Sequence, residues 1–376
     1  MDTGSDIIYN YRSLPGIIEG CLSTILLCIW ISLHPNVPLA KRNSFPPPKL
    51  KLMLLSLVAP EVTLGFAARQ ALVARWVAKK HSVSLTHAFF YTMGGFETCN
   101  GHPIVAQNQL EIYLSSIRMV KQEEIKDKSK KNTMLATIMV VQILWFIGSY
   151  ATRIYTHLPV SALEIVTFSL TLVHITIWIL WRKKPKDVGY PITLKTLGFC
   201  SRTVDTANAA TPNPPHYLGE IPPEHSSASD HYGYYRHFDP MSVGSVPLYW
   251  CMTFEEGPSY LPLVLLLQII CATVLGAIYC SAWNIIFASS IEMWMWRVSA
   301  SLTTALPWLC LIFLKISNRC KHNTISRHIF ASINHGLIAL LLLTRVLLLG
   351  ISLTTLRHMP EPMFLNLKWN IVFPHV

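Results

Sequence analysis

Glu61 is the acidic residue whose surroundings in the sequence most suggest chemistry. It directly follows Pro60 in the largely apolar stretch SLVAPEVTLGFAARQ. A carboxyl group at a dry interface between helices tends to keep its proton, and a neutral acid in an apolar pocket can protonate a bound substrate. Glu61 is therefore a candidate general acid. Its alternative role is a structural hydrogen bond to a neighbouring helix.

The residues around Glu61 also predict how its helix is shaped. Pro60 cannot donate a hydrogen bond to the carbonyl of Ser56, and its ring crowds that position, so we expect a kink there. Glu61, Gly65 and Ala68 are spaced as i, i+4 and i+7 and share one helix face. This face is small enough for a neighbouring helix to approach closely.

A second candidate acid, Glu97, lies near the end of the segment SLTHAFFYTMGGFETCN. Gly94 and Gly95 form a helix-end signal just before it, so Glu97 belongs either to a re-entrant site or to the cytoplasmic surface. His87 and Tyr91 are one turn apart on one face. His87 is a candidate for proton transfer, although a single histidine is more often a hydrogen-bonded core residue.

A polar seam is predicted on a later helix. Its positions repeat with three- and four-residue spacing while most neighbours are Leu, Ile and Val, which is the pattern of one helix face. Lipid cannot satisfy polar groups, so the seam must face other helices or a wet cavity. It either lines a substrate cavity or joins helices by hydrogen bonds. The seam comprises Glu164, which is also a candidate catalytic acid, and Thr167, Thr171, His174 and Trp178.

Arg345 is a basic residue inside the last apolar run. A guanidinium group at membrane depth needs a carboxylate partner or must extend to the interface. Glu61 and Glu164 are both plausible partners, and the sequence does not choose between them. We place Arg345 with the polar seam among the candidate residues of a substrate cavity.

Composition shows what kind of fold must position these residues. Hydrophobic residues make up 51% of the 376-residue chain and charged residues 14%, and the mean hydropathy is +0.38. Soluble domains carry about 25% charged residues, so an ordinary soluble enzyme is excluded, as are a disordered chain and a secreted disulfide scaffold. The sequence predicts an all-α integral membrane protein, a bundle of seven or eight transmembrane helices. The predicted spans are 15–33, 52–74, 133–152, 160–181, 260–282, 298–316 and 328–353, with the shorter run 83–96 as an eighth.

The distribution of lysine and arginine predicts the orientation. If 83–96 crosses the membrane, 20 of the 31 basic residues fall on one side and 8 on the other. The basic side is cytoplasmic by the positive-inside rule, so both termini are lumenal or outside. The chain 1–376 is then one polytopic membrane domain with two cytoplasmic segments. These are a Lys/Glu-rich segment, 97–132, and a long Pro/His-rich loop, 182–258.

Several functional classes find no support. The net charge of +11 comes from basic residues beside apolar runs, such as Arg182-Lys183-Lys184, which indicates contact with anionic lipid heads and not with nucleic acid. We find no C-x-x-C pair, phosphate-binding loop or acidic cluster for Mg²⁺, and therefore expect no metal and no cofactor. The spacing of the loop histidines matches no known ligand pattern. They are His216, His225, His231 and His237.

Four stretches of the sequence together form a recognisable pattern. They are GCLSTILLCIWISLHPNVP, APEVTLGFAARQA, THAFFYTMGGF and KPKDVGYP. With these stretches the chain resembles a group of poorly characterised filamentous-fungal multi-pass membrane proteins. The resemblance covers mainly the first half of the chain, and it supplies no catalytic motif. Some members of that group accompany secondary-metabolite pathways, including indole diterpene pathways.

The resemblance implies an enzyme or accessory protein of secondary metabolism that acts on a lipophilic isoprenoid. Small fungal membrane terpene cyclases use intramembrane acids to start cyclisation by protonation, and Glu61, Glu97 or Glu164 would supply such an acid. The alternative is a non-enzymatic transporter, or a scaffold for other membrane-bound pathway enzymes; the absence of an internal repeat gives no support to an inverted-repeat transporter. A lesser alternative is an O-acyltransferase of the wax-synthase type using His335, without that family's Trp-His-rich motif. The endoplasmic reticulum is the expected location, with the plasma membrane as the alternative.

Overall fold

A computed structural model describes residues 11–37, 47–195, 246–252, 259–319 and 324–365. Within these ranges the fold is mostly helical with almost no strand, and six helices are long and apolar enough to cross a membrane. The predicted class, a helical protein with several apolar helices of membrane-spanning length, is confirmed. The six are α2 (Leu14–Ser32), α8 (Thr133–Tyr155), α9 (Ala162–Trp181), α10 (Leu261–Cys280), α11 (Ser290–Arg319) and α12 (Thr324–Thr354).

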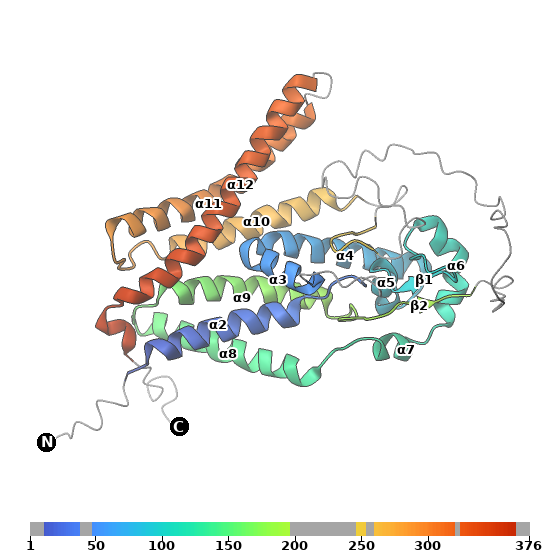
Figure 1. Ribbon diagram of the computed structural model, residues 1–376, viewed down its shortest axis with the longest axis horizontal. Helices are drawn as coiled ribbons and strands as arrows, with labels where there is room; N and C mark the ends of the chain where they lie inside the picture. Colours follow the sequence, from blue (N-terminus) through green and yellow to red (C-terminus); the bar gives the residue numbers. More distant parts are fainter. Residues whose placement is uncertain (1–10, 38–46, 196–245, 253–258, 320–323, 366–376) are drawn as a thin grey trace, which may run out of the picture.

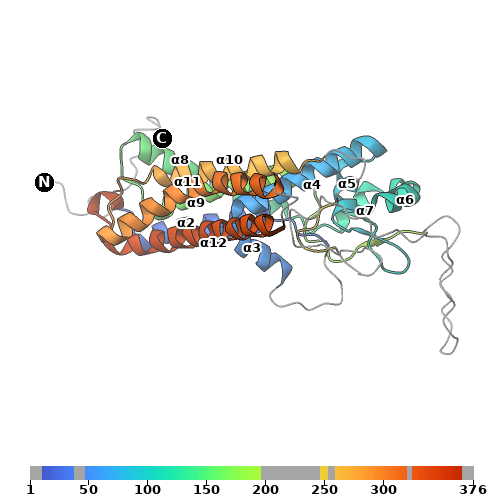
Figure 2. The same cartoon turned by 90° about the horizontal axis from the view of Figure 1, so that it is seen from above.

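The long helices form an elongated bundle with two different ends (Figures 1 and 2). At one end, which we call the terminal end, the first and last described segments meet: the backbone N–H of Arg12 donates to the carbonyl of Phe364 at 2.7 Å. Two short 3-10 helices close this end, η2 (Thr355–His358) and η3 (Glu361–Phe364). Helix α9 is the most enclosed of the six long helices.

Short elements gather at the opposite end, which we call the loop end (Figure 1). Two-residue strands pair in parallel, with Phe96 opposite Ile192 and Glu97 opposite Thr193. The Lys/Glu-rich segment 97–132 contains two helices, whereas 196–245 of the predicted long loop, including its four histidines, lies outside the described residues. The loop-end elements are α5 (Leu85–Thr92), α6 (Gln107–Met119), α7 (Gln122–Asp127), β1 (Phe96–Glu97) and β2 (Ile192–Thr193).

The predicted continuous span 52–74 is two helices. Helix α3 (Pro48–Val58) ends before Ala59, and α4 (Pro60–His81) starts in a new direction, with 119° between them. Pro60 is the first residue of α4, where its missing N–H costs no hydrogen bond. The local effect of Pro60 is therefore as predicted, but it separates two helices where a kink within one was expected.

Both outer ends of the α3–α4 pair lie at the loop end. Near the start of α3, Lys49 Nζ contacts Asp187 Oδ2 at 2.6 Å and lies 3.8 Å from the ring centre of Trp30, at the end of α2. At the end of α4, the His81 carbonyl accepts from Arg118 Nη2 of α6 at 2.7 Å. The pair thus enters the bundle and returns to the end at which it entered.

The prediction that 83–96 crosses as an eighth span is wrong. Its helix, α5, has 8 residues, which is about 12 Å of helix against a hydrocarbon core of about 30 Å. The run is apolar because Phe89, Phe90 and Tyr91 are buried against other loop-end elements and not against lipid. Gly94 has a positive φ of +77° just after α5, which agrees with the helix end predicted from Gly94 and Gly95.

Candidate functional site

The break between α3 and α4 places Glu61 opposite Arg345 of α12. Glu61 Oε2 and Arg345 Nη2 are 3.6 Å apart, and both side chains are buried, at 7% and 3% exposure. Of the two predicted partners for Arg345, the structure selects Glu61. The guanidinium carbon also lies 5.6 Å from the centre of the Tyr279 ring, within the range of a cation–π contact.

The hydrogen-bonding capacity of this ion pair is largely unused. None of the three side-chain nitrogens of Arg345 has an acceptor among the described residues, and Glu61 Oε2 has no donor there. A guanidinium group presents five N–H donors, and buried polar groups are normally hydrogen-bonded. The site therefore holds charges that attract each other without the hydrogen bonds that would fix them.

Local sequence explains how the pair is positioned. Glu61 lies in the first turn of α4, where the helix dipole stabilises negative charge. One turn later, Gln268 of α10 closely approaches Gly65 of α4, as predicted from the small residues on this helix face. A Cβ atom at position 65 would lie 2.2 Å from Nε2 of Gln268. A side chain at position 65 would therefore displace the Gln268 side chain beside the pair.

Other polar groups bridge the elements around the break. Ser56 Oγ of α3 donates to Thr63 Oγ1 of α4 at 2.8 Å. His174 Nδ1 of α9 lies 2.9 Å from Ser32 Oγ of α2, and His174 also lies beside the backbone of Ser56. Together with Glu61 and Arg345, these groups give the bundle a polar interior where α3 gives way to α4.

The remaining seam residues of α9 face α2. The hydroxyl of Thr167 donates to the backbone carbonyl of Leu163 at 2.8 Å, and the hydroxyl of Thr171 donates to the backbone carbonyl of Thr167 at 2.7 Å. Both threonines also lie beside cysteines of α2, and Trp178 packs half-buried against the cluster at that interface. These two hydrogen bonds lie within α9, so both predicted roles of the seam, joining helices and lining a substrate cavity, stay predictions.

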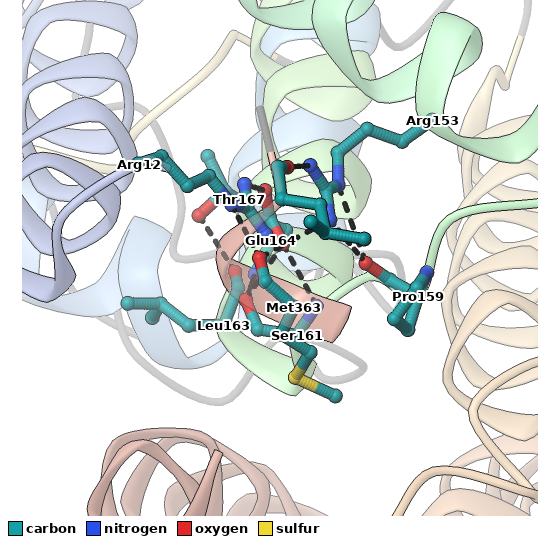
Figure 3. Close-up of polar contacts among 9 residues, drawn as sticks. Arg12, Arg153, Pro159, Ser161, Leu163, Glu164, Thr167 and Met363 are labelled. Carbon is teal, nitrogen blue, oxygen red and sulfur yellow. Dashed lines mark hydrogen bonds and ion pairs between the residues drawn. The ribbon is translucent and has the colours of Figure 1, made fainter. Parts of the chain in front are cut away.

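Glu164 stabilises the start of α9 (Figure 3). Its Oε2 accepts from the backbone N–H of Ser161 at 2.8 Å and from Ser161 Oγ at 2.9 Å, which completes a capping box. Arg12 forms an ion pair with the same carboxylate through both terminal nitrogens. Beside it, buried Arg153 donates to the carbonyls of Pro159, Met363 and Leu365. Glu164 and these arginines hold the terminal end together.

His87 and Glu97 lie at the loop end and are not brought to Glu61. His87 Nε2 lies 2.8 Å from the carbonyl of Val120, so this nitrogen must carry the proton and donate it. Its Nδ1 lies 2.6 Å from Ser84 Oγ. Glu97 Oε1 accepts from Thr193 Oγ1 at 2.7 Å, beside the strand pair. Their catalytic roles stay predictions.

Lys184 is the charged residue that sequence reasoning missed. Its ammonium group is fully buried and donates to the carbonyl of His34 at 2.5 Å, to Gln70 Oε1 at 2.8 Å and to Asn36 Oδ1 at 3.3 Å. It also lies 4.7 Å from the centre of the Trp181 ring. Burial lowers the pKa of Lys184 well below the ordinary lysine value. Its place in a run of basic residues suggested a surface position, and no signal in that run shows otherwise.

Comparison with known proteins gives one match. A family model described as a family of unknown function (DUF8562) matches residues 7–88 and 78–199, which together make up just over half of the chain. These residues include Glu61, Glu164 and Lys184 but not Arg345. Neither the curated proteins nor the solved structures contain a match.

Proposed function

The chain belongs to this family of unknown function (DUF8562), and from that premise we propose that it is an integral membrane carrier for a lipophilic organic anion. Arg345 binds the anion and Glu61 takes up a proton in the same event. The site is the interior of the bundle at the α3–α4 break, and the transported species is an amphipathic molecule with one negative charge.

One observation carries the proposal: a buried arginine whose donors are unused beside a buried glutamate 3.6 Å away. An ionisable residue costs at least about 2.5 kcal/mol at the bilayer centre. Replacing a buried ion pair by apolar residues is often neutral or stabilising, so stability alone does not account for keeping this one. Free donors on a guanidinium group suit a planar anion that can bind it with two hydrogen bonds.

Charge balance explains the coupling to a proton. In the resting state one positive and one negative charge face each other. An anion that binds Arg345 while Glu61 stays ionised would place two negative charges beside one positive charge, which is costly at low dielectric. Protonation of Glu61 restores the balance, so one anion and one proton bind together and leave together.

The shape of the α3–α4 pair supports the same assignment. In carriers, helices broken inside the membrane supply a positive helix N-terminus and free backbone groups to the substrate site. Such irregular backbone is tolerated only where protein or a water-filled cavity surrounds it. Helix α4 starts inside the bundle, with Ala59 and Pro60 buried and Glu61 in its first turn.

This arrangement favours a carrier over the enzymes considered from the sequence. A general acid must hold its proton before it meets substrate, whereas an ion pair with Arg345 requires the carboxylate form of Glu61. His335, the candidate histidine of an acyltransferase, is exposed on α12, and its Nδ1 lies 2.6 Å from the carbonyl of Ala331 in the same helix.

We further propose six membrane spans and one re-entrant pair, α3–α4. When the end of α4 is assigned to the loop side, 23 of the 31 basic residues of the sequence fall on that side and 5 on the other. The loop end is then cytoplasmic and both termini are lumenal or outside, in the endoplasmic reticulum membrane by default. A glycosylation acceptor site inserted beside Lys80 should stay unmodified and one at the N-terminus should be modified. Modification at Lys80 would show that α4 crosses.

The carrier is tested with a defined probe, 1-naphthalenesulfonate, an aromatic anion that stays charged at every pH used. Proteoliposomes containing the purified full chain should accumulate the probe faster when the outside is more acidic than the inside. Liposomes without protein, and proteoliposomes given neutral naphthalene, report leakage and simple partitioning. Uptake equal to that of empty liposomes across a series of sulfonate and carboxylate probes would refute the proposal and leave the scaffold role.

A further inference from the structure

A basic cavity opens at the loop end, where α7 approaches the start of α8 and the end of α9. Its volume is about 330 Å³. Four cationic side chains line it together with neutral polar groups, and no carboxylate is part of the lining. The lining residues are Lys126, Lys131, Arg182 and Lys183, with Thr86, Gln122, Ser129 and Pro185.

The cavity has a built frame. Ser129 Oγ accepts from the backbone N–H of Lys186 at 2.8 Å, and the carbonyl of Lys186 accepts from the backbone N–H of Lys130 at 2.9 Å. Across it, Lys131 Nζ donates to the carbonyl of Arg182 at 2.6 Å, and Gln122 Nε2 donates to Thr86 Oγ1 at 3.4 Å. These contacts hold the segment before α8 against the segment after α9, so the four cations are gathered by the fold and not by one stretch of sequence.

The position of the cavity relates it to the membrane surface. Thr133 is the first residue of α8 and Trp181 the last of α9, so Lys131, Arg182 and Lys183 lie within two residues of the ends of two apolar helices. In the orientation proposed above, on which this inference rests, that is the depth of lipid head groups on the cytoplasmic side. An anion that arrives there on a lipid needs no aqueous path.

We propose that this cavity is a binding site for a phosphorylated lipid head group. Phosphate oxygens are strong acceptors for lysine and arginine, and arginine can bind them with two parallel hydrogen bonds. The hydroxyl groups of Thr86 and Ser129 and the amide of Gln122 provide neutral partners for the rest of the head group. The site is separate from Glu61 and Arg345, and it does not require the chain to be a carrier.

Charge crowding gives the site a pH dependence. Partial burial and the charge of Lys183 lower the pKa of Lys131 to about 8. Lys131 must carry its proton to attract phosphate, so affinity should fall as the pH rises through about 8, and anion binding should draw a proton onto Lys131. The charged and titratable groups around Lys131 are Lys126, Arg182, Lys183, Lys186 and His34.

The test uses the full chain purified in detergent and two phosphate sources. Short-chain phosphatidylinositol 4-phosphate is the lipid probe, inorganic phosphate is the free anion, and short-chain phosphatidylcholine is the lipid control; native mass spectrometry counts the bound molecules. The wild-type protein should retain the phosphorylated lipid in preference to phosphatidylcholine. Changing all four lining cations to glutamine should weaken binding at least about tenfold, because it removes every charged donor to the phosphate.

A matched control separates the cavity from general charge. Lys128→Gln with Lys130→Gln removes two exposed charges from the same segment, neither of which lines the cavity, and this variant should bind as the wild type does. If the four-residue variant does not fold, the single change Lys183→Gln at an exposed position serves in its place. Equal binding by the cavity and control variants would overturn the proposal. If the protein binds inorganic phosphate but does not prefer the phosphorylated lipid over phosphatidylcholine, the ligand is a soluble phosphate. That result would overturn the head-group assignment.

Discussion

Replacing Arg345 with leucine is expected to prevent the chain from accumulating as folded protein. The change leaves Glu61 as a buried carboxylate without its partner, and breaking one side of a buried ion pair costs about 3 to 5 kcal/mol. That is a large part of the 5 to 15 kcal/mol that stabilises a typical domain. Fluorescence-detected size-exclusion chromatography after heating measures the loss as a lower midpoint or as an aggregated peak.

Two further variants make this result specific to the pair. Arg357→Leu removes an exposed arginine from η2 and should change the free energy of unfolding by no more than about 0.5 kcal/mol. Glu61→Gln combined with Arg345→Leu removes both charges, and it should recover most of the stability that Arg345→Leu alone loses. A double variant as unstable as the single one would show that Glu61 and Arg345 are not energetically coupled.

Replacing Lys184 with methionine is expected to have the second largest effect on stability. The methionine side chain keeps much of the volume but leaves the carbonyl of His34 and the side-chain oxygen of Gln70 without their donor, whereas Asn36 Oδ1 still accepts from Gln70 Nε2 at 2.8 Å. A buried acceptor that loses its partner costs about 1 to 3 kcal/mol, so two of them give a loss of roughly 2 kcal/mol or more. Lys183→Met, at the neighbouring exposed position, is the control and should unfold as the wild type does.

The pH dependence of unfolding gives Lys184 a second readout. Burial lowers its pKa in the folded protein below the ordinary value of 10.5. Between these two values the unfolded chain binds a proton that the folded chain does not, so the free energy of unfolding rises with pH across that window. The wild type should gain stability there relative to Lys184→Met. A constant difference between the two proteins at every pH would contradict a lowered pKa for Lys184.

Local sequence signals predicted much of the fold. The apolar runs predicted the six long helices, and the double glycine predicted the end of α5. Pro60 predicted an interruption of the helix in which it lies. The course of the α3–α4 pair could not be predicted, because it depends on where Lys49 and His81 find partners in other segments. The 83–96 run was misassigned for a related reason: apolar side chains packed in a loop-end core look the same in sequence as side chains facing lipid.

The candidate site, like the fold, was predicted only in part from the sequence. Spacing along a helix predicted the close approach at Gly65 and the common face of the α9 seam. It could not decide between Glu61 and Glu164 for Arg345, because that choice is made by the packing of α12 against α9 and α3, which brings Arg345 beside the start of α4. Lys184 was missed because its three acceptors belong to residues 34, 36 and 70, which are far from it in the sequence. The basic run that contains Lys184 therefore does not indicate that this lysine is buried.

The measurement that tests the carrier most directly is proton-driven uptake of 1-naphthalenesulfonate by proteoliposomes containing Glu61→Gln. Glutamine keeps the shape of a protonated glutamate and an oxygen that can accept a hydrogen bond from Arg345. Because Arg345 loses its carboxylate partner, the variant is purified with the probe present as the counter-anion, and only the monodisperse fraction is reconstituted. The probe can then bind Arg345, but no proton can be gained or lost at position 61. Wild-type uptake should rise when the outside is made more acidic than the inside. Uptake by Glu61→Gln should be the same with and without the proton gradient. If this variant responds to the gradient as the wild type does, Glu61 does not couple proton and anion, and the central claim is wrong.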